Sequence, residues 1–212
     1  VNPKLVDPRV ELLRGWPNGW PLELDGSFDA LIFVGQHAKA GTPRGHLCHT
    51  QTLKHIDLSV NGVSIGEFGQ LAMCASELGV RTIFGSGDEA FTREARALVP
   101  GIETVSVKRG LRKGSGEDLD EKSYTRHFSG AIHVPPERAR KLIYSGVLRA
   151  LARAKREKFG LIKLRPPYRL VEIFRPDEGH RGKRISRNHH PSSVIALMNM
   201  PHLFKSIKGG RR

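Results

Sequence analysis

The sequence has two cysteines and no long apolar segment. Cys48 and Cys74 cannot supply the disulfide framework on which small secreted domains depend, and a reduced, cytoplasmic compartment is therefore favoured. No apolar run approaches the roughly 20 residues that a membrane-spanning helix needs, so we expect no membrane insertion. The chain begins at Val1 without a signal-like segment, and we expect that something upstream was removed or is carried elsewhere.

Acidic residues are scarce in the second half of the chain. Residues 1–100 hold nine Lys and Arg against eleven Asp and Glu, whereas residues 101–212 hold 26 against ten. Such a basic second half could bind nucleic acid or an anionic surface. The simpler interpretation is a solvated basic face followed by a basic tail, KSIKGGRR. Because the sequence has no zinc-finger spacing, RNP-like aromatic motif or KH-type loop, a nucleic-acid partner is not favoured.

The apolar pattern predicts alternating strands and helices. DALIFV (29–34), VRTIF and IETVSVK are apolar runs typical of buried parallel strands. Apolar residues spaced by three and four predict a helix from Glu67 to Gly79, and a second helix follows GSGDE. HIDLSV ends at Asn61-Gly62, which is a strong hairpin signal. The order predicts an α/β fold with a parallel sheet flanked by helices and a smaller C-terminal α+β unit.

The predicted elements divide the chain into three parts. Residues 1–109 form the α/β core, which would carry a metal site and is incomplete at its N-terminus. Residues 110–134 are polar and glycine-rich, and we expect an exposed loop or insertion. Residues 135–212 comprise a long helix, from Pro135-Pro136 to about Lys158, and a small basic α+β unit. In that unit LIKL and YRLVEIF predict antiparallel strands, GHRGKRISRNHHP a basic loop and SSVIALMNM a short helix.

Candidate metal ligands follow the first predicted strand. His37 lies at the carboxyl end of that strand, where ligands bind in open α/β sheets, although a hydrogen-bonded structural histidine is the alternative. Glu67 begins a predicted helix between Gly66 and Gly69, as a favourable charge at the helix dipole or as a carboxylate ligand. Imidazole and carboxylate are ligands that zinc prefers.

His49 lies between these two residues in HLCHT. It could bind metal, act as general base or nucleophile, or cap a loop, and His46 and His55 are competitors at similar distance. We do not expect a Cys48–His49 dyad, because adjacent residues of an extended chain point to opposite sides and nothing marks the thiol as activated.

Two further motifs have simpler interpretations. GSGDE resembles a phosphate-binding loop, but Asp88 and Glu89 would place negative charge where an anion should bind. These residues fit a helix cap better. Alternatively, Asp88 could form a hydrogen bond to a metal ligand without binding the metal itself. His189-His190 lies in the basic tail and is interpreted as part of a solvated loop.

Several ordered blocks together resemble the M55 family of zinc D-aminopeptidases. They are DPRVELLRGWP, SFDALIFVGQHAKAGTPRGHLCHT, NGVSIGEFGQLAMCASELGV, GSGDEA and LVPGIETVSVKRG. The similarity runs from about Asp7 to Lys108 and resumes at PPERARKLI. It implies a two-zinc site that removes N-terminal D-residues from short peptides, in a homo-oligomer.

The resemblance also assigns roles to the three residues. His37 in GQHA matches a histidine zinc ligand, and Glu67 in GEFG matches a glutamate zinc ligand. His49 matches the histidine proposed as catalytic, either as nucleophile or as general base. The loop before it is about one residue longer than in some members, which leaves His46 as the fallback.

The family's Asp-x-Glu strand and a further ligand histidine have no counterpart in this sequence. Two zinc ions about 3.5–4 Å apart need a bridging carboxylate, which His37 and Glu67 alone do not supply. Without that strand and its helix, the sheet should also expose an apolar edge and face. The segment could be a separate N-terminal chain or fragment that completes the site, or the sequence could be truncated. The third alternative is an inactive homologue without metal that acts as a binding module for nucleic acid or another anionic partner.

Overall fold

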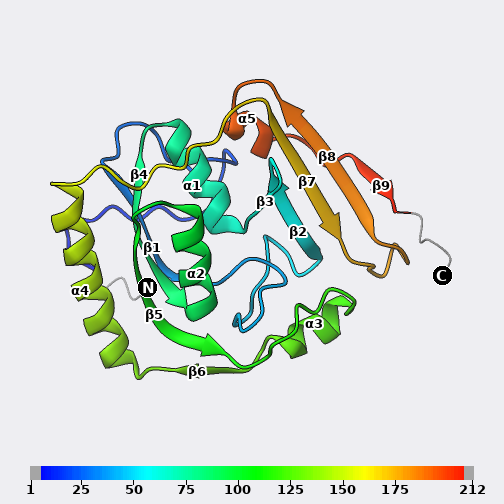
Figure 1. The fold of residues 1–212 in the computed structure, drawn as a ribbon, viewed down its shortest axis with the longest axis horizontal. Helices are drawn as coiled ribbons and strands as arrows, with labels where there is room; N and C mark the ends of the chain where they lie inside the picture. The colour runs from blue at the N-terminus through cyan, green and yellow to red at the C-terminus, as the bar shows by residue number, and fades with distance from the viewer. Residues whose placement is uncertain (1–5, 208–212) are drawn as a thin grey trace.

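The computed structural model describes residues 6–207, which form two sheets and five helices (Figure 1). The first sheet has the order β1-β4-β5-β6, and β1, β4 and β5 are parallel. Its strands are β1 (Ala30–Gln36), β4 (Arg81–Asp88), β5 (Glu103–Gly110) and β6 (Ala131–His133). The second sheet is antiparallel and has the order β3-β2-β7-β8-β9. Its strands are β2 (His55–Val60), β3 (Val63–Ser64), β7 (Tyr168–Phe174), β8 (Arg184–His190) and β9 (Phe204–Ser206).

Helices cover both faces of the first sheet. Helices α1 (Glu67–Glu77) and α2 (Glu89–Leu98) contact each other and the sheet on one side, around a core that includes Phe68 and Phe91. Helix α4 (Pro136–Ala154) packs over β4 and β5, where Phe84 and Ala150 belong to a separate core. The predicted class, an α/β fold with a parallel sheet between helices and an additional α+β unit, is therefore confirmed. The second sheet packs against α5 (Val194–Met198).

Local sequence explains where several elements begin and end. Asn61 and Gly62 both have positive φ, 50° and 80°, as a two-residue hairpin turn with right-handed twist requires. Gly79 has φ 79° just after α1, where residues with a side chain are disfavoured. Asp88 caps α2, because its carboxylate accepts a hydrogen bond from the N–H of Phe91 at 2.6 Å.

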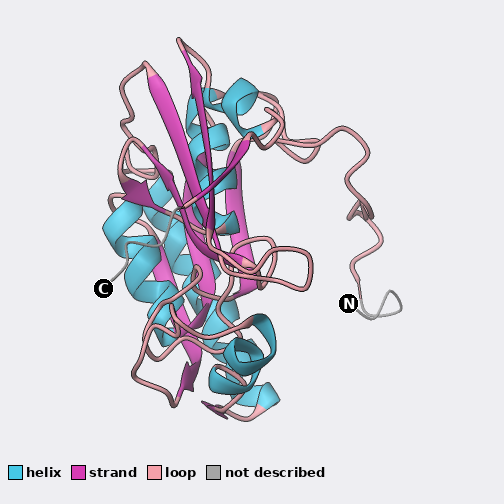
Figure 2. Cartoon of the chain, turned by 90° about the vertical axis from the view of Figure 1, so that its right-hand side faces the viewer, coloured by secondary structure: helices cyan, strands magenta, loops and turns pink. Residues whose placement is uncertain are grey.

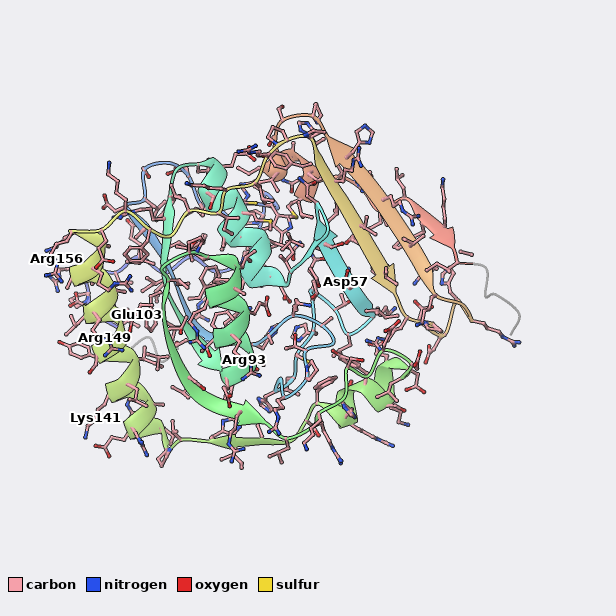
Figure 3. All side chains as sticks on the ribbon, in the orientation of Figure 1. Asp57, Arg93, Glu103, Lys141, Arg149 and Arg156 are labelled. Atoms are coloured by element: carbon pink, nitrogen blue, oxygen red, sulfur yellow. The ribbon has the colours of Figure 1, made fainter. Side chains whose placement is uncertain are left out.

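Helix α4 carries much of the basic charge of the second half. Figure 3 shows Lys141 and Arg149 along this helix and Arg156 just beyond its C-terminal end, with Glu103 on the neighbouring strand β5. The guanidinium of Arg149 lies 2.9 Å from the Glu103 carboxylate, and Lys141 pairs with Glu137 within the helix. These partly exposed pairs contribute little to stability, so the packing of α4 depends mainly on its buried face.

The structure corrects the sequence predictions at two places in the first sheet. GSGD was expected as a loop, but it forms the buried last half of β4. The 110–134 segment was expected as an exposed loop, but it contains strand β6 and helix α3 (Glu121–His127). Asp120 caps α3 by accepting a hydrogen bond from the N–H of Ser123, and Tyr124 and Phe128 bury its inner face.

Two predictions for the C-terminal unit were also wrong. LIKL is not a strand, whereas the basic segment GHRGKRISRNHHP contains β8, which places His189 and His190 in that strand. The inner face of β8 buries Ser186 and Asn188 in place of apolar side chains, so it lacks the alternation that marks most strands. The short helix in SSVIALMNM is confirmed as α5.

Strand β1 is an open edge of the first sheet. Among residues 6–207 it pairs only with β4, and the side chains of Ile32 and Val34 are 44% and 61% exposed. The expected exposed apolar edge is therefore present. Figure 2 shows the chain that precedes β1 extending away from the sheets as a loop. Leu13 and Trp16 in this segment are exposed. Within the described residues, no helix is both long and apolar enough to span a membrane.

Candidate metal centre

Three predicted residues converge beside the end of β1. His37 follows the last residue of that strand, Glu67 is the first residue of α1, and His49 lies on the connection from β1 to β2. One ligand atom from each side chain lies within 4.8 Å of the other two, and all three side chains are partly buried. In the described part of the chain, this is the one group of three or more such side chains that meets this condition.

Both imidazoles present the same nitrogen to the centre of the cluster. Nδ1 of His37 lies 3.0 Å from the carbonyl oxygen of Ala38, and Nδ1 of His49 lies 2.7 Å from that of Leu47. A carbonyl oxygen can only accept, so each Nδ1–H donates and Nε2 keeps its lone pair in the neutral ring. Burial lowers the pKa of His37, which favours this neutral form. The rings stack with their centroids 4.0 Å apart.

One carboxylate oxygen of Glu67 accepts a hydrogen bond, and the other has no hydrogen-bond partner. Its Oε1 accepts a hydrogen bond from the N–H of Gln51 at 2.7 Å and lies 3.6 Å from Nε2 of His49 and 4.0 Å from Nε2 of His37. Its Oε2 is buried and has no hydrogen-bond partner. A buried carboxylate oxygen without a partner is costly, so a bound cation would relieve an existing penalty.

The cluster fits zinc by its donor set. Two ligand atoms each about 2.0–2.1 Å from a tetrahedral ion lie roughly 3.3 Å apart, slightly closer than the two Nε2–Oε1 distances in this cluster. The two Nδ1–H···O=C bonds are the second interactions that typically orient metal-binding histidines. If His37 and Glu67 hold the ion, they fill two positions of a tetrahedral site and leave the others for further ligands, water or substrate.

The two glycines beside Glu67 serve protein packing. A Cβ on Gly66 would lie 3.0 Å from Cα of Lys39, and a Cβ on Gly69 would lie 2.6 Å from Cβ of Ile65. At both glycines the close neighbour is therefore the chain itself. The contact at Gly66 brings the start of α1 against the segment that follows His37.

The competing histidines lie outside the cluster. His55 is buried, and its Nε2 lies 3.3 Å from a carboxylate oxygen of Glu172. The ring of His46 packs edge-on against that of His133, with the ring centroids 5.1 Å apart, and the backbone N–H of His46 donates to the carboxylate of Asp88.

Cys48 is not an activated nucleophile. Its thiol is buried, and burial raises its pKa to about 11. Its sulfur lies 3.4 Å from the hydroxyl of Tyr124, and His49 contributes nothing to that contact. The expectation that no Cys–His dyad forms therefore agrees with the geometry.

The sequence did not reveal two buried residues that form hydrogen bonds to the loop carrying His49. Arg175 is fully buried below the loop that carries His49, and Tyr124 stands beside it. The four-residue spacing of Tyr124 and Phe128 after a capping Asp120 could have revealed α3. Nothing in the sequence marks Arg175, which follows strand β7 as one arginine among many.

Comparisons with known proteins identify the family of the chain. A model of the M55 peptidase family, described as D-aminopeptidase, matches residues 1–178. A D-aminopeptidase of Bacillus subtilis (strain 168) is 30% identical over 112 residues, which cover 52% of this chain and 40% of that protein. The matched part thus spans less than half of that relative's length.

A solved structure shares the fold. It is described as the Zn-dependent D-aminopeptidase DppA from Bacillus subtilis, a self-compartmentalizing protease. The TM-score is 0.74 at 19% identity, and the match covers 92% of this chain and 69% of that one.

Proposed function

The chain belongs to the M55 family of D-aminopeptidases, and from that premise we propose that it is a zinc-dependent aminopeptidase that removes N-terminal D-residues from short peptides. The observation that carries the proposal is the convergence of His37, His49 and Glu67 at the end of β1. Two oriented imidazoles and a buried carboxylate oxygen without a partner support a cation site, and the three side chains are 22–28% exposed.

We assign different roles to the three residues. His37 and Glu67 would hold zinc, which, when bound, polarises a peptide carbonyl as a Lewis acid. His49 would be the catalytic residue. Its Nδ1–H is engaged by the Leu47 carbonyl, so Nε2 is the atom that accepts a proton from an attacking water or attacks the carbonyl itself. The stacked ring of His37 restricts the rotation of His49.

A two-ion site would require more acidic ligands than this cluster provides. We propose that they arrive on an additional strand, from residues beyond this sequence on the same or a separate polypeptide, paired with the free edge of β1. The exposed side chains of Ile32 and Val34 support this, because a long apolar edge strand is normally covered. A parallel strand at that edge would end beside His37.

We also propose that the assembled protein is a homo-oligomer. The solved relative is described as self-compartmentalizing, and an enclosed assembly would restrict access to short peptides. Light scattering of the purified protein tests this, and a monomer at micromolar concentration would contradict it.

Three single substitutions separate the proposed roles. We expect His37→Ala and Glu67→Ala to weaken zinc binding at least about 100-fold, because each removes a ligand. His49→Ala should retain zinc but lower the hydrolysis of a D-alanyl amide by about 10³-fold, within the range of general base catalysis. Zinc content is measured by elemental analysis, and intact mass under denaturing conditions shows whether another polypeptide accompanies the chain.

His46→Ala is the matched control, because His46 lies nearby and is the alternative candidate. It should change neither zinc content nor activity. Zinc binding that survives Glu67→Ala would remove Glu67 from the ligands, and activity that survives His49→Ala would disprove its catalytic role. A protein that binds no zinc and hydrolyses no D-alanyl amide would contradict the proposed function as a whole.

A further inference from the structure

The connection that carries His49 has an unfavourable backbone. Residues 37–54 include no helix and no named strand. Leu47 lies two residues before His49 and Gln51 two residues after it, and both have positive φ, 52° and 56°. Residues with a side chain rarely adopt this conformation, and it persists where the surroundings hold it. The placement of His49 Nε2 therefore depends on groups outside the loop.

Arg175 is the largest of these groups. Its side chain is 0% exposed, and no carboxylate of residues 6–207 lies within ion-pair distance of it. Its guanidinium donates instead to backbone carbonyl oxygens of two segments, the end of the loop that carries His49 and the segment that precedes α3. The acceptors are Leu53 at 2.7 Å, His55 at 3.2 Å, Leu119 at 2.7 Å and Gly116 at 3.2 Å.

The main chain of the same residue extends this connection. The N–H of Arg175 donates to the carbonyl oxygen of Lys54 at 2.8 Å. Three consecutive carbonyls, those of residues 53–55, are thus bound by one buried residue at the end of β7. A charged donor buried without an acidic partner is stable only when such acceptors surround it.

Tyr124 links Arg175 to the other side of His49. The guanidinium carbon lies 4.0 Å from the centre of the Tyr124 ring. The Tyr124 hydroxyl donates to the carbonyl oxygen of Cys48 at 2.9 Å and accepts from the N–H of Gly41 at 2.8 Å. The loop is therefore held at Cys48, one residue before His49, and at residues 53–55 beyond it.

We propose that Arg175, acting with Tyr124, is a positioning residue that fixes the loop so that Nε2 of His49 faces Glu67 and His37. The proposal rests on the proposed function, because it assumes that this arrangement is the working one. Lysine cannot replace Arg175, since an ammonium group lacks the planar fork that bonds several carbonyls in different directions. Phenylalanine at position 124 keeps the ring beneath the guanidinium but removes the bond to Cys48.

The test compares Arg175→Lys and Tyr124→Phe with Leu197→Ala. Leu197 is equally buried in the core below the second sheet, so its truncation lowers thermal stability without touching the loop. The main readout is amide hydrogen exchange at Leu47 and Gln51, whose N–H groups donate to the carbonyl of Phe128 and to Glu67. Zinc affinity and the rate of D-alanyl amide hydrolysis are measured on the same samples, well below their melting temperatures.

We expect Arg175→Lys to accelerate exchange at Leu47 and Gln51 at least about tenfold. It should also weaken zinc binding by about 10–100-fold, because the N–H of Gln51 on this loop holds the carboxylate of the proposed ligand Glu67 at 2.7 Å, and loss of such outer support typically has this effect. Tyr124→Phe should act in the same direction and less strongly, and it decides the question if Arg175→Lys does not fold. Leu197→Ala should lower the melting temperature alone.

Two results separate this proposal from the proposed function. If Arg175→Lys and Tyr124→Phe reduce thermal stability as Leu197→Ala does, but keep wild-type exchange at the two amides and wild-type zinc affinity, Arg175 is merely structural and the inference is wrong. If the wild-type protein binds no zinc, the proposed function fails, and the exchange rates alone then decide whether Arg175 holds the loop.

Discussion

Glu94 on α2 accepts a hydrogen bond from the N–H of Lys39, two residues after His37, at 2.8 Å. Its other oxygen is buried without a partner, and burial raises the pKa of this carboxyl to about 7. The folded state therefore keeps a proton that the unfolded chain releases near pH 4.5. The stability that Glu94 contributes is complete below that pH and is lost as the pH rises through about 7.

Glu94→Gln should remove this dependence, because an amide resembles the protonated acid and does not titrate. We expect the variant to be more stable than wild type at pH 8 by about 2 kcal/mol and nearly equal to it at pH 4.5. Urea unfolding at both pH values measures the difference. Glu89→Gln is the control on the same helix, since the Glu89 side chain is 47% exposed. A constant difference between Glu94→Gln and wild type at both pH values would refute the assignment.

The candidate cluster could be predicted from the sequence because its three residues lie close together in the chain. His37, His49 and Glu67 fall within 31 residues at the ends of recognisable elements, and the structure brings all three into one group. Tyr124 and Arg175 contact the same loop from positions 76 and about 120 residues away. Contacts over such separations depend on the fold of the whole chain, so local pattern does not reveal them.

The packing of α4 on the first sheet depends on one small residue. A Cβ added to Gly146 would lie 2.6 Å from Cγ2 of Val105 and 2.7 Å from Cε2 of Phe84. Gly146→Ala should therefore destabilise the protein by about 1 kcal/mol, because overpacking of about 2 kcal/mol exceeds a helix-propensity gain of about 1.

Ser145→Ala is the matched control for this prediction. Ser145 precedes Gly146 on the exposed side of α4, so alanine there should stabilise by a few tenths of a kcal/mol. Urea unfolding of the two variants gives the comparison. Equal stabilisation by both substitutions would show that α4 does not pack closely at Gly146.

Elements with a regular apolar pattern could be predicted, and those shaped by close backbone contact could not. The hairpin at Asn61-Gly62 and helix α1 follow local rules. The last half of β4 reads as a loop because of its glycines, yet a Cβ on Gly87 would collide with the carbonyl of Gln36 on β1. Gly87 therefore permits β4 to pair closely with β1, and Gly85 permits the close approach of Phe91 on α2, which is the opposite of the loop that such glycines indicate in isolation.

The two sheets are interleaved along the chain. Strands β2 and β3 lie between β1 and α1 in sequence, but β2 pairs with β7, more than a hundred residues later. The connection that carries His49 therefore runs from the end of β1 in the first sheet to the start of β2 in the second sheet, as Figure 1 shows. This arrangement lets β7, through Arg175, support a loop that begins in the first sheet.

The free edge of β1 should govern how the 212-residue chain behaves alone. Val34 is 61% exposed on a strand that has one side unpaired within residues 6–207, and such edges recruit strands of other molecules. Val34→Lys places a charge that opposes this pairing, so aggregation at raised concentration, followed by light scattering, should slow several-fold. Leu203→Lys is the control, because Leu203 is 56% exposed outside the first sheet. If both substitutions slow aggregation equally, the added charge acts only by raising solubility. That result would contradict the edge of β1 as the place where a further strand binds.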